Sequence, residues 1–261
     1  MRRFFSVGIV KYGEFLAERV ESVKVEFVCY GADGIVRTCA DQCAVSIDEF
    51  GASAIVAGRV RACAVDSNDV ALEYRAVSDK KTIINLTNHA YFNLNGYDSG
   101  DILSHTLKIN ADRYTPIDEI SIPTGDLPSV EGTPFDFREE KAIGRDIEED
   151  FLQLKNGLGY DHNFCIADFD GSLKTAAIAK ADKSGISMEV KTDLPGVQLY
   201  TGNFFDGTIK GKGGVPMTKR CAFCLETQVY PDTPNHPQWP GCTYEAGEEY
   251  VSNTVFSFKV D

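Results

Sequence analysis

Apolar and polar residues alternate with a period of two along much of the chain. Apolar side chains recur at every second position of "VKVEFVC" (23–29), "ISMEV" (186–190) and the C-terminal "FSFKV" (256–260). Because successive side chains of a strand point to opposite faces, this period predicts half-buried β-strands. Clusters of turn-forming residues stand between such runs, namely "NGYDSGD", "IPTGD", "DKSG", "KGKGG" and "NHPQWPG". The pattern therefore predicts many strands joined by turns.

Helical periodicity is confined to one short segment. We predict a short helix within "GRDIEEDFLQLKN" (144–156), and we find no long helical pattern, internal repeat or low-complexity linker. Strands without intervening helices favour an antiparallel all-β architecture. No position stands out as a boundary, so we predict a single domain over residues 1–261.

The charge balance excludes some partners. The 261 residues include 39 acidic and 26 basic side chains, for a formal net charge of −13. Nucleic acids are bound by a surplus of Lys and Arg, so we expect no nucleic-acid partner. No apolar run approaches the roughly 20 residues that span a bilayer, and the apolar start of the chain is broken by Lys11. We therefore expect no membrane association and no signal peptide, while a neutral substrate such as a sugar suits an acidic surface.

The eight cysteines do not form a recognisable metal-binding pattern. Cys221 and Cys224 form a single CxxC pair, and Cys39 and Cys43 a looser one. A zinc site would need two well-formed pairs or added histidines, so buried thiols are the preferred interpretation. Without a secretory signal, the thiols are expected to be reduced in a cytoplasmic protein. The glycine-rich segment 207–214 lacks the spacing of a phosphate loop and is predicted to be a hairpin tip.

Four segments combine several polar side chains with predicted strands or strand ends. They are "TIINLTNHAYFNLNG" (82–96), "GYDHNF" (159–164), "TDLPGVQLYTGNF" (192–204) and "CLETQVYPDTPNHPQWPG" (224–241). Loops at strand ends commonly carry catalytic groups, but they also form ordinary turns.

Glu226 lies in the middle of a predicted strand. Alternation places Phe223, Leu225 and Thr227 on one face, and Cys224, Glu226 and Gln228 on the other. A glutamate facing a pocket with a raised pKa would be a general base near neutral pH. A solvated glutamate on the outer face of a sheet is the alternative, and the strand alone leaves both open.

The four histidines differ in what their surroundings indicate. A single histidine near a strand end, such as His89, is more often a hydrogen-bonded structural residue than a catalyst. His105 and His236 carry no signal of function. His162 follows Asp161, and adjacent side chains of an extended segment point to opposite faces. At most one of that pair can therefore face a given pocket.

Taken together, the four segments resemble the aldose 1-epimerase (galactose mutarotase) family. Segment 82–96 resembles that family's signature around its catalytic histidine, and "GLGYDHNF" (157–164) its sugar-binding aspartate segment. "PGVQLYTGNF" (195–204) resembles its binding-glutamine segment, and "LETQVYPDTPNHPQWP" (225–240) its catalytic-glutamate segment. The order is the same, and the resemblance runs continuously from about Leu72 to the C-terminus.

The resemblance implies a fold, a reaction and a set of residues. The fold would be a large antiparallel β-sandwich with few short helices. His89 would be the general acid and Glu226 the general base, on opposite sides of one acetal-like centre. Asp161 and Gln198 would hold sugar hydroxyls, with Tyr91 beside them. The reaction would interconvert the α and β anomers of an aldose such as galactose or glucose, with no metal or other cofactor. We also expect the asparagines around His89 to hold the imidazole in place.

The N-terminal quarter departs from the family pattern. Ala62 and Cys63 fall where an Asn-Arg pair is expected, and Arg59 and Arg61 are the candidate substitutes, with Arg59 assigned to substrate binding. A second histidine, normally in a His-Gly-Gly turn, has no counterpart, because "HGG" occurs nowhere in the sequence. Part of the sugar site is therefore expected to be absent or rebuilt.

Two other hypotheses follow from these departures. One is a carbohydrate-binding β-sandwich that has lost catalysis with its missing segment. The other is a relative that acts on hexose phosphates, which would need a basic cluster to bind the phosphate, and none occurs near the four segments. The protein is expected to be a monomer or a homodimer.

Overall fold

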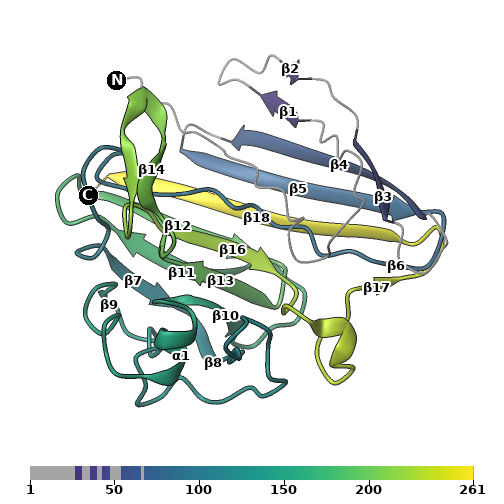
Figure 1. Ribbon diagram of the computed structural model, residues 1–261. Coiled ribbons are helices and arrows are strands. Elements are labelled where there is room, and N and C mark those ends of the chain that lie inside the picture. Colours follow the sequence, from purple (N-terminus) through teal and green to yellow (C-terminus); the bar gives the residue numbers. More distant parts are fainter. Residues whose placement is uncertain (1–26, 31–35, 40–42, 48–53, 66–67, 261) are drawn as a thin grey trace. The chain divides into compact units, whose positions relative to one another are not determined.

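The computed structural model describes residues 27–30, 36–39, 43–47, 54–65 and 68–260 of the chain (Figure 1). Strands dominate, and the described residues contain one short α-helix, α1 (Leu152–Asn156), which lies within the segment predicted to be helical. Among these residues, no helix is both long and apolar enough to cross a membrane. The chain divides into two compact units, which are described separately.

The first unit comprises Thr87–Asp232 and the end of the last strand. Its centre is a four-stranded antiparallel sheet in the order β16 (Cys224–Gln228), β13 (Gly196–Tyr200), β10 (Asp161–Ile166) and β8 (Ala111–Tyr114). A second run of antiparallel strands follows the order β12 (Ile186–Thr192), β11 (Lys174–Lys180), β7 (Thr106–Ile109) and β9 (Lys141–Ala142). The hairpin of β14 (Asp206–Lys210) and β15 (Pro216–Thr218) has its tip at the 3₁₀ turn Lys212–Gly214.

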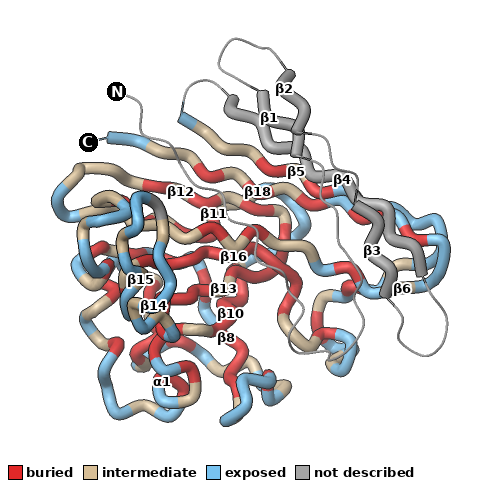
Figure 2. The backbone as a smooth tube through the Cα atoms, turned by 45° about the horizontal axis from the view of Figure 1, so that its top comes forward, coloured by how far each residue is buried: buried red, intermediate tan, exposed pale blue. Residues whose placement is uncertain are grey.

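The four-stranded sheet has two chemically different faces. His162 pairs with Leu199, Phe164 with Val197, and Leu199 in turn with Leu225. Paired residues point to the same side of a sheet, so these side chains form one largely apolar face. That face packs against aromatic rings that include Phe135, whose ring lies 4.6 Å from that of Tyr114. The other face, taken up below, is polar, yet Figure 2 shows all of β16 and most of β13 and β10 as buried.

The second unit comprises the described parts of 10–86 and Thr233–Ser257. Its strands run β2 (Val36–Cys39), β1 (Phe27–Tyr30), β4 (Ala54–Val65), β5 (Asp69–Ser78) and β18 (Glu249–Val260), with β3 (Cys43–Ile47) also paired to β4. β6 (Thr82–Ile83) pairs with β17 (Thr243–Tyr244), and Thr233–Asn235 is a 3₁₀ turn. Its pairs are antiparallel except for β1 with β4, which is parallel.

The predicted alternation is confirmed in the middle of the strands but not at all of their ends, where Ile186 and Phe258 are only half-buried. Met188 and Val190 of β12 are fully buried, and so is Phe256 of β18, whereas Val260 is exposed at the strand end. In the segment 82–96, the strand β6 is confined to Thr82–Ile83. Residues 23–26 of the first predicted strand lie outside the described residues, and the single-domain assignment stays a prediction.

Candidate functional site

The second face of the four-stranded sheet carries three rows of mostly polar side chains. In the middle row Glu226 of β16 pairs with Gln198 of β13, which pairs with Asn163 of β10. A neighbouring row contains Cys224, Tyr200 and Asp161, and the row on the other side contains Gln228, Gly196 and Cys165. Sheet register thus brings residues from three distant segments onto one surface.

A chain of amide and carboxylate hydrogen bonds crosses this face. The Gln198 side-chain amide donates to Oδ1 of Asp161 at 2.9 Å, and Gln228 donates to Oε1 of Gln198 at 3.1 Å. Gln228 also reaches Oδ1 of Asn163 at 3.3 Å. Gly196 is required for this packing, since a Cβ there would lie 2.3 Å from Oδ1 of Asn163. The network fixes the orientation of Asp161 and Gln198.

A single β-bridge brings His89 to this face. Phe92 and Phe223 exchange backbone hydrogen bonds of 2.8 and 2.9 Å as an isolated antiparallel bridge. Continued by three residues in each direction, that register places His89 opposite Glu226. The side chains do meet, with His89 Nε2 3.4 Å from Glu226 Oε1.

The catalytic candidates His89 and Glu226 differ in burial and in the direction of their pKa shifts. The Glu226 side chain is 2% exposed, and burial, assisted by the negative charge of Asp161, raises its pKa to about 8. The His89 side chain is 14% exposed, and burial lowers its pKa. Both shifts favour the neutral forms. Near neutral pH and without a ligand, the pair therefore shares one proton, which lies mainly on the carboxyl group. The solvated glutamate considered from the sequence is excluded.

The placement of the pair differs from the expected one. We expected the acid and the base on opposite sides of the reacting centre. Their 3.4 Å separation leaves no room for a carbon between them, so a ligand must lie against both from one side. Both oxygens of a hemiacetal are bonded to the same carbon, so two adjacent groups can reach them together.

Asp161 is the second carboxylate of the site. Burial raises its pKa to about 6, while the hydrogen bond from Gln198 acts in the opposite direction. Its neighbour His162 points to the apolar face, where burial lowers the pKa of the imidazole to about 3 and Nε2 lies 3.0 Å from Oε1 of Gln153. The prediction that only one of the two faces a given pocket is confirmed.

Aromatic rings border the pair. The Tyr91 ring lies 4.9 Å from His89, 6.2 Å from Tyr200 and 5.3 Å from Phe205. The Tyr200 ring in turn lies 5.9 Å from His89, edge to face. Such rings offer apolar surface with hydroxyl groups at the tips, a combination that suits the faces and edges of a sugar.

The asparagines of the first segment hold the loop that carries His89. Asn93 donates to the carbonyls of Gly100 and Cys221, both at 3.0 Å, and Asn88 accepts from the Ala90 amide. Asn95 donates to Asp182 at 2.7 Å. These bonds anchor the loop, but none of them involves the His89 ring, so the expectation that the asparagines hold the imidazole stays a prediction.

A buried arginine positions the segment that leads into Asp161. Arg220 donates to the carbonyl of Leu158 at 2.8 Å and also bonds Asn203, which itself donates to the carbonyls of Gly157 and Tyr160. Gly159 lies directly against the Arg220 guanidinium, at a φ of +134° that favours glycine.

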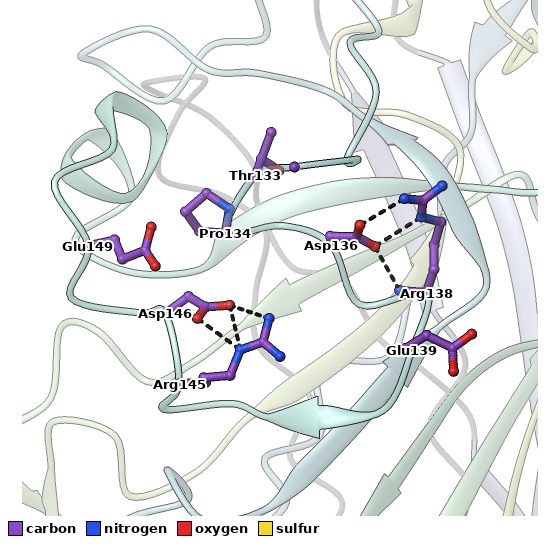
Figure 3. Close-up of a pocket in the computed structure, with 9 residues that line it drawn as sticks. Thr133, Pro134, Asp136, Arg138, Glu139, Arg145, Asp146 and Glu149 are labelled. Atoms are coloured by element: carbon purple, nitrogen blue, oxygen red, sulfur yellow. Dashed lines mark hydrogen bonds and ion pairs between the residues drawn. The ribbon is translucent and has the colours of Figure 1, made fainter.

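A surface hollow of about 630 Å³ lies elsewhere in the first unit, within residues 132–149 (Figure 3). Both arginines that line it are already paired, since Arg138 bonds Asp136 at 2.8 Å and Arg145 bonds Asp146 at 2.9 Å. None of the sugar-site candidates lines it. The polar face with His89 and Glu226 is therefore the better candidate.

Known proteins are similar to about three quarters of this chain. Residues 61–257 match the family described as aldose 1-epimerase. Over 196 residues the chain is 44% identical to bovine galactose mutarotase and 43% identical to the aldose 1-epimerase of Escherichia coli K12. The chain belongs to the aldose 1-epimerase family. The aligned part is about three quarters of this chain, but only 56% of the length of each of those two relatives.

Solved structures of aldose epimerases also resemble this chain. An aldose epimerase homologue from C. elegans has a TM-score of 0.70 at 29% identity, covering 87% of this chain and 68% of its own. Galactose 1-epimerase from Lactobacillus acidophilus has a TM-score of 0.67 at 29% identity, covering 84% and 62%. The predicted galactose mutarotase-like all-β fold is confirmed.

Five of the six site residues expected from the family resemblance lie together: His89, Tyr91, Asp161, Gln198 and Glu226. The sixth, Arg59, lies in β4, where it pairs with Arg75, but its side chain is outside the described residues. Ala62 and Cys63 lie in the same strand.

Three residues at the site were given no role from the sequence: Tyr200, Cys224 and Asn163. Each lies two positions from a predicted site residue in its strand, and so on the same face. Alternation had placed Cys224 on the face of Glu226, and the same rule applied to Gln198 and Asp161 would have found Tyr200 and Asn163.

Proposed function

We propose that this protein is an aldose 1-epimerase, which interconverts the α and β anomers of an aldose such as galactose or glucose. The observation that carries the proposal is the 3.4 Å contact of His89 with a buried Glu226, beside an Asp161–Gln198 pair suited to hydroxyl groups. The names of the similar proteins, galactose mutarotase and aldose 1-epimerase, support the same reaction.

The reaction needs one base and one acid at a single hemiacetal. Glu226 takes the proton of the anomeric hydroxyl while His89 gives a proton to the ring oxygen. The bond between the anomeric carbon and the ring oxygen breaks, and an open-chain aldehyde forms. Rotation about the adjacent carbon–carbon bond presents the other carbonyl face. Reclosure gives the other anomer and returns both protons to their original sites.

Without sugar the shared proton lies mainly on Glu226, whereas these roles require it on His89. Sugar binding favours its transfer. When the anomeric hydroxyl donates a hydrogen bond to the Glu226 carboxylate, it stabilises the ionised form. A ring oxygen that accepts from His89 stabilises the imidazolium in the same way. The single proton of the pair therefore passes from carboxyl to imidazole across the 3.4 Å contact as the sugar binds.

The remaining residues bind the sugar. Asp161 and the amide of Gln198, already joined at 2.9 Å, offer an acceptor and a donor to adjacent sugar hydroxyls. The Tyr91 ring lies 4.9 Å from that of His89, and we propose that Arg59 of β4 adds a further donor. A cytoplasmic location and a monomeric or homodimeric state remain predictions.

The test is polarimetry of freshly dissolved α-D-galactose and α-D-glucose. We expect the wild-type protein to speed the approach to anomeric equilibrium, and His89→Asn and Glu226→Gln each to lower turnover by about 10²–10⁴. His236→Asn and Glu131→Gln are matched controls, since His236 lies against Trp239 and the Glu131 side chain is 75% exposed. Full activity in both site variants would overturn the assigned roles. Sugar binding without acceleration by the folded wild-type protein would instead identify a carbohydrate-binding relative.

A further inference from the structure

Cys224 lies beside the proposed acid and base, yet the reaction does not use it. It is two residues from Glu226 on the same face of β16 and is fully buried. Nitrogen, sulfur and oxygen ligand atoms of His89, Cys224 and Glu226 all lie within 4.8 Å of one another. Among the described residues, this is the group that could hold a metal ion.

The donor set and its spacing suit zinc. Imidazole, thiolate and carboxylate are the ligands of tetrahedral Zn²⁺, whereas Mg²⁺ and Ca²⁺ take oxygen ligands and avoid thiolates. With metal bonds of about 2.0–2.1 Å, the nitrogen and oxygen ligands of a tetrahedral ion lie about 3.3 Å apart. The 3.4 Å between His89 Nε2 and Glu226 Oε1 matches that separation.

The Glu226 carboxyl group is only partly satisfied. Within the described part of the chain, its buried Oε2 has no hydrogen-bond partner. Burying such a group is costly, and a cation held at Oε1 would offset part of that cost. Since His89 is the most exposed of the three, an ion would enter from its side and keep one position open to water.

We propose that His89, Cys224 and Glu226 form a binding site for Zn²⁺, with water as the fourth ligand, and that zinc is a reversible inhibitor of the enzyme. Coordination takes the thiolate of Cys224 and the carboxylate of Glu226, so any protons that these groups carry leave to solvent as the ion binds. The ion then occupies the nitrogen and the oxygen that would serve as acid and base. The inhibitory half of this inference rests on the proposed function, whereas the binding half does not.

Direct metal binding tests the site without reference to activity. Tag-free protein is titrated with Co²⁺, which gives a thiolate-to-metal charge-transfer band only when a thiolate is a ligand, and zinc affinity is measured against a chromophoric chelator. We expect one ion per chain, and a loss of zinc affinity of at least about tenfold in Cys224→Ala because one of three protein ligands is gone. Cys224→Val keeps the buried space occupied by an apolar side chain and is the second variant, in case alanine impairs folding.

Cys221→Ala is the matched control. It removes the other thiol of the CxxC pair, a half-buried residue that is not one of the three ligands. We expect its cobalt band and zinc affinity to equal those of the wild type. Absence of a thiolate band in the wild-type protein, or equal zinc affinity in wild type and both Cys224 variants, would overturn the site.

Polarimetry tests the inhibition separately. The rate with zinc is divided by the rate after a chelator is added, for each protein, so that basal differences cancel. We expect zinc to abolish the wild-type acceleration, the chelator to restore it, and the inhibitory concentration to rise at least about tenfold in Cys224→Val. Tight binding with an unchanged rate would overturn the inhibitory half. A Cys224-dependent cobalt band in a protein with no activity under any condition would uphold the site and refute the proposed function.

Discussion

Replacing Glu226 by glutamine should remove a pH-dependent loss of stability. Burial raises the pKa of Glu226 from its ordinary value of 4.5 to about 8. Between these two values the folded state binds more protons than the unfolded state. The stabilisation from the neutral carboxyl is therefore fully present below pH 4.5 and is lost as the pH rises through 8. Glutamine has nearly the same shape and stays neutral throughout.

The magnitude follows from the size of the shift. The difference between 4.5 and about 8, at about 1.4 kcal/mol for each pH unit, gives about 5 kcal/mol at full ionisation. Water that enters around the ionised carboxylate reduces the effect, so we expect about 3–5 kcal/mol. Glu226→Gln should have nearly wild-type stability at pH 4.5 and exceed the wild type by that amount at pH 9.

Urea denaturation of both proteins at half-unit steps from pH 4.5 to 9 measures this difference directly. Asp170→Asn is a control of opposite sign, because hydrogen bonds from Ser172 and Lys174 hold the pKa of Asp170 below its ordinary value. That variant should be less stable than the wild type throughout this range, and it should lose the difference only on further acidification below pH 3.8, which added urea series at lower pH would measure. A flat difference between Glu226→Gln and wild type across the whole range would refute the reasoning.

Three further outcomes are expected. A pair that works with one shared proton gives a bell-shaped pH profile of kcat/KM, with an acid limb below pH 6.5 from His89 and an alkaline limb near pH 8 from Glu226. Stopped-flow polarimetry across this pH range measures the profile. Absence of the alkaline limb would contradict the role of Glu226. Gly196→Ala places a Cβ 2.3 Å from Oδ1 of Asn163 and should lower the unfolding free energy by about 1–3 kcal/mol, measured by urea denaturation. Gln198→Ala removes a sugar contact and the partner of Asp161, so KM should rise by about tenfold while the alkaline limb stays in place; an unchanged KM would exclude Gln198 from sugar binding.

The sequence predicted the strands of this protein well, because a period of two reports which side chains are buried. Met188, Val190 and Phe256 are buried as their alternation indicates. The same rule separated Glu226 from Leu225 and Asp161 from His162. The identity of the catalytic candidates came from family resemblance rather than from periodicity.

Two properties of the site could not be predicted. The row of Cys224, Tyr200 and Asp161 depends on how three distant strands are registered, and alternation within one strand says nothing about its partner. The position of the shared proton depends on burial, which raises the pKa of Glu226 and lowers that of His89 only in the folded chain.

The bridge between Phe92 and Phe223 determines which changes in chain length this site tolerates. Residues inserted in the β14–β15 hairpin lie between Phe92 and Phe223 and lengthen only a connection. The spacing of His89 from Phe92 and of Glu226 from Phe223 stays the same. A single residue added between His89 and Phe92 would instead turn the imidazole to the opposite side of an extended segment. The three residues from His89 to Phe92 and the three from Phe223 to Glu226 are therefore stretches whose length the acid–base pair constrains.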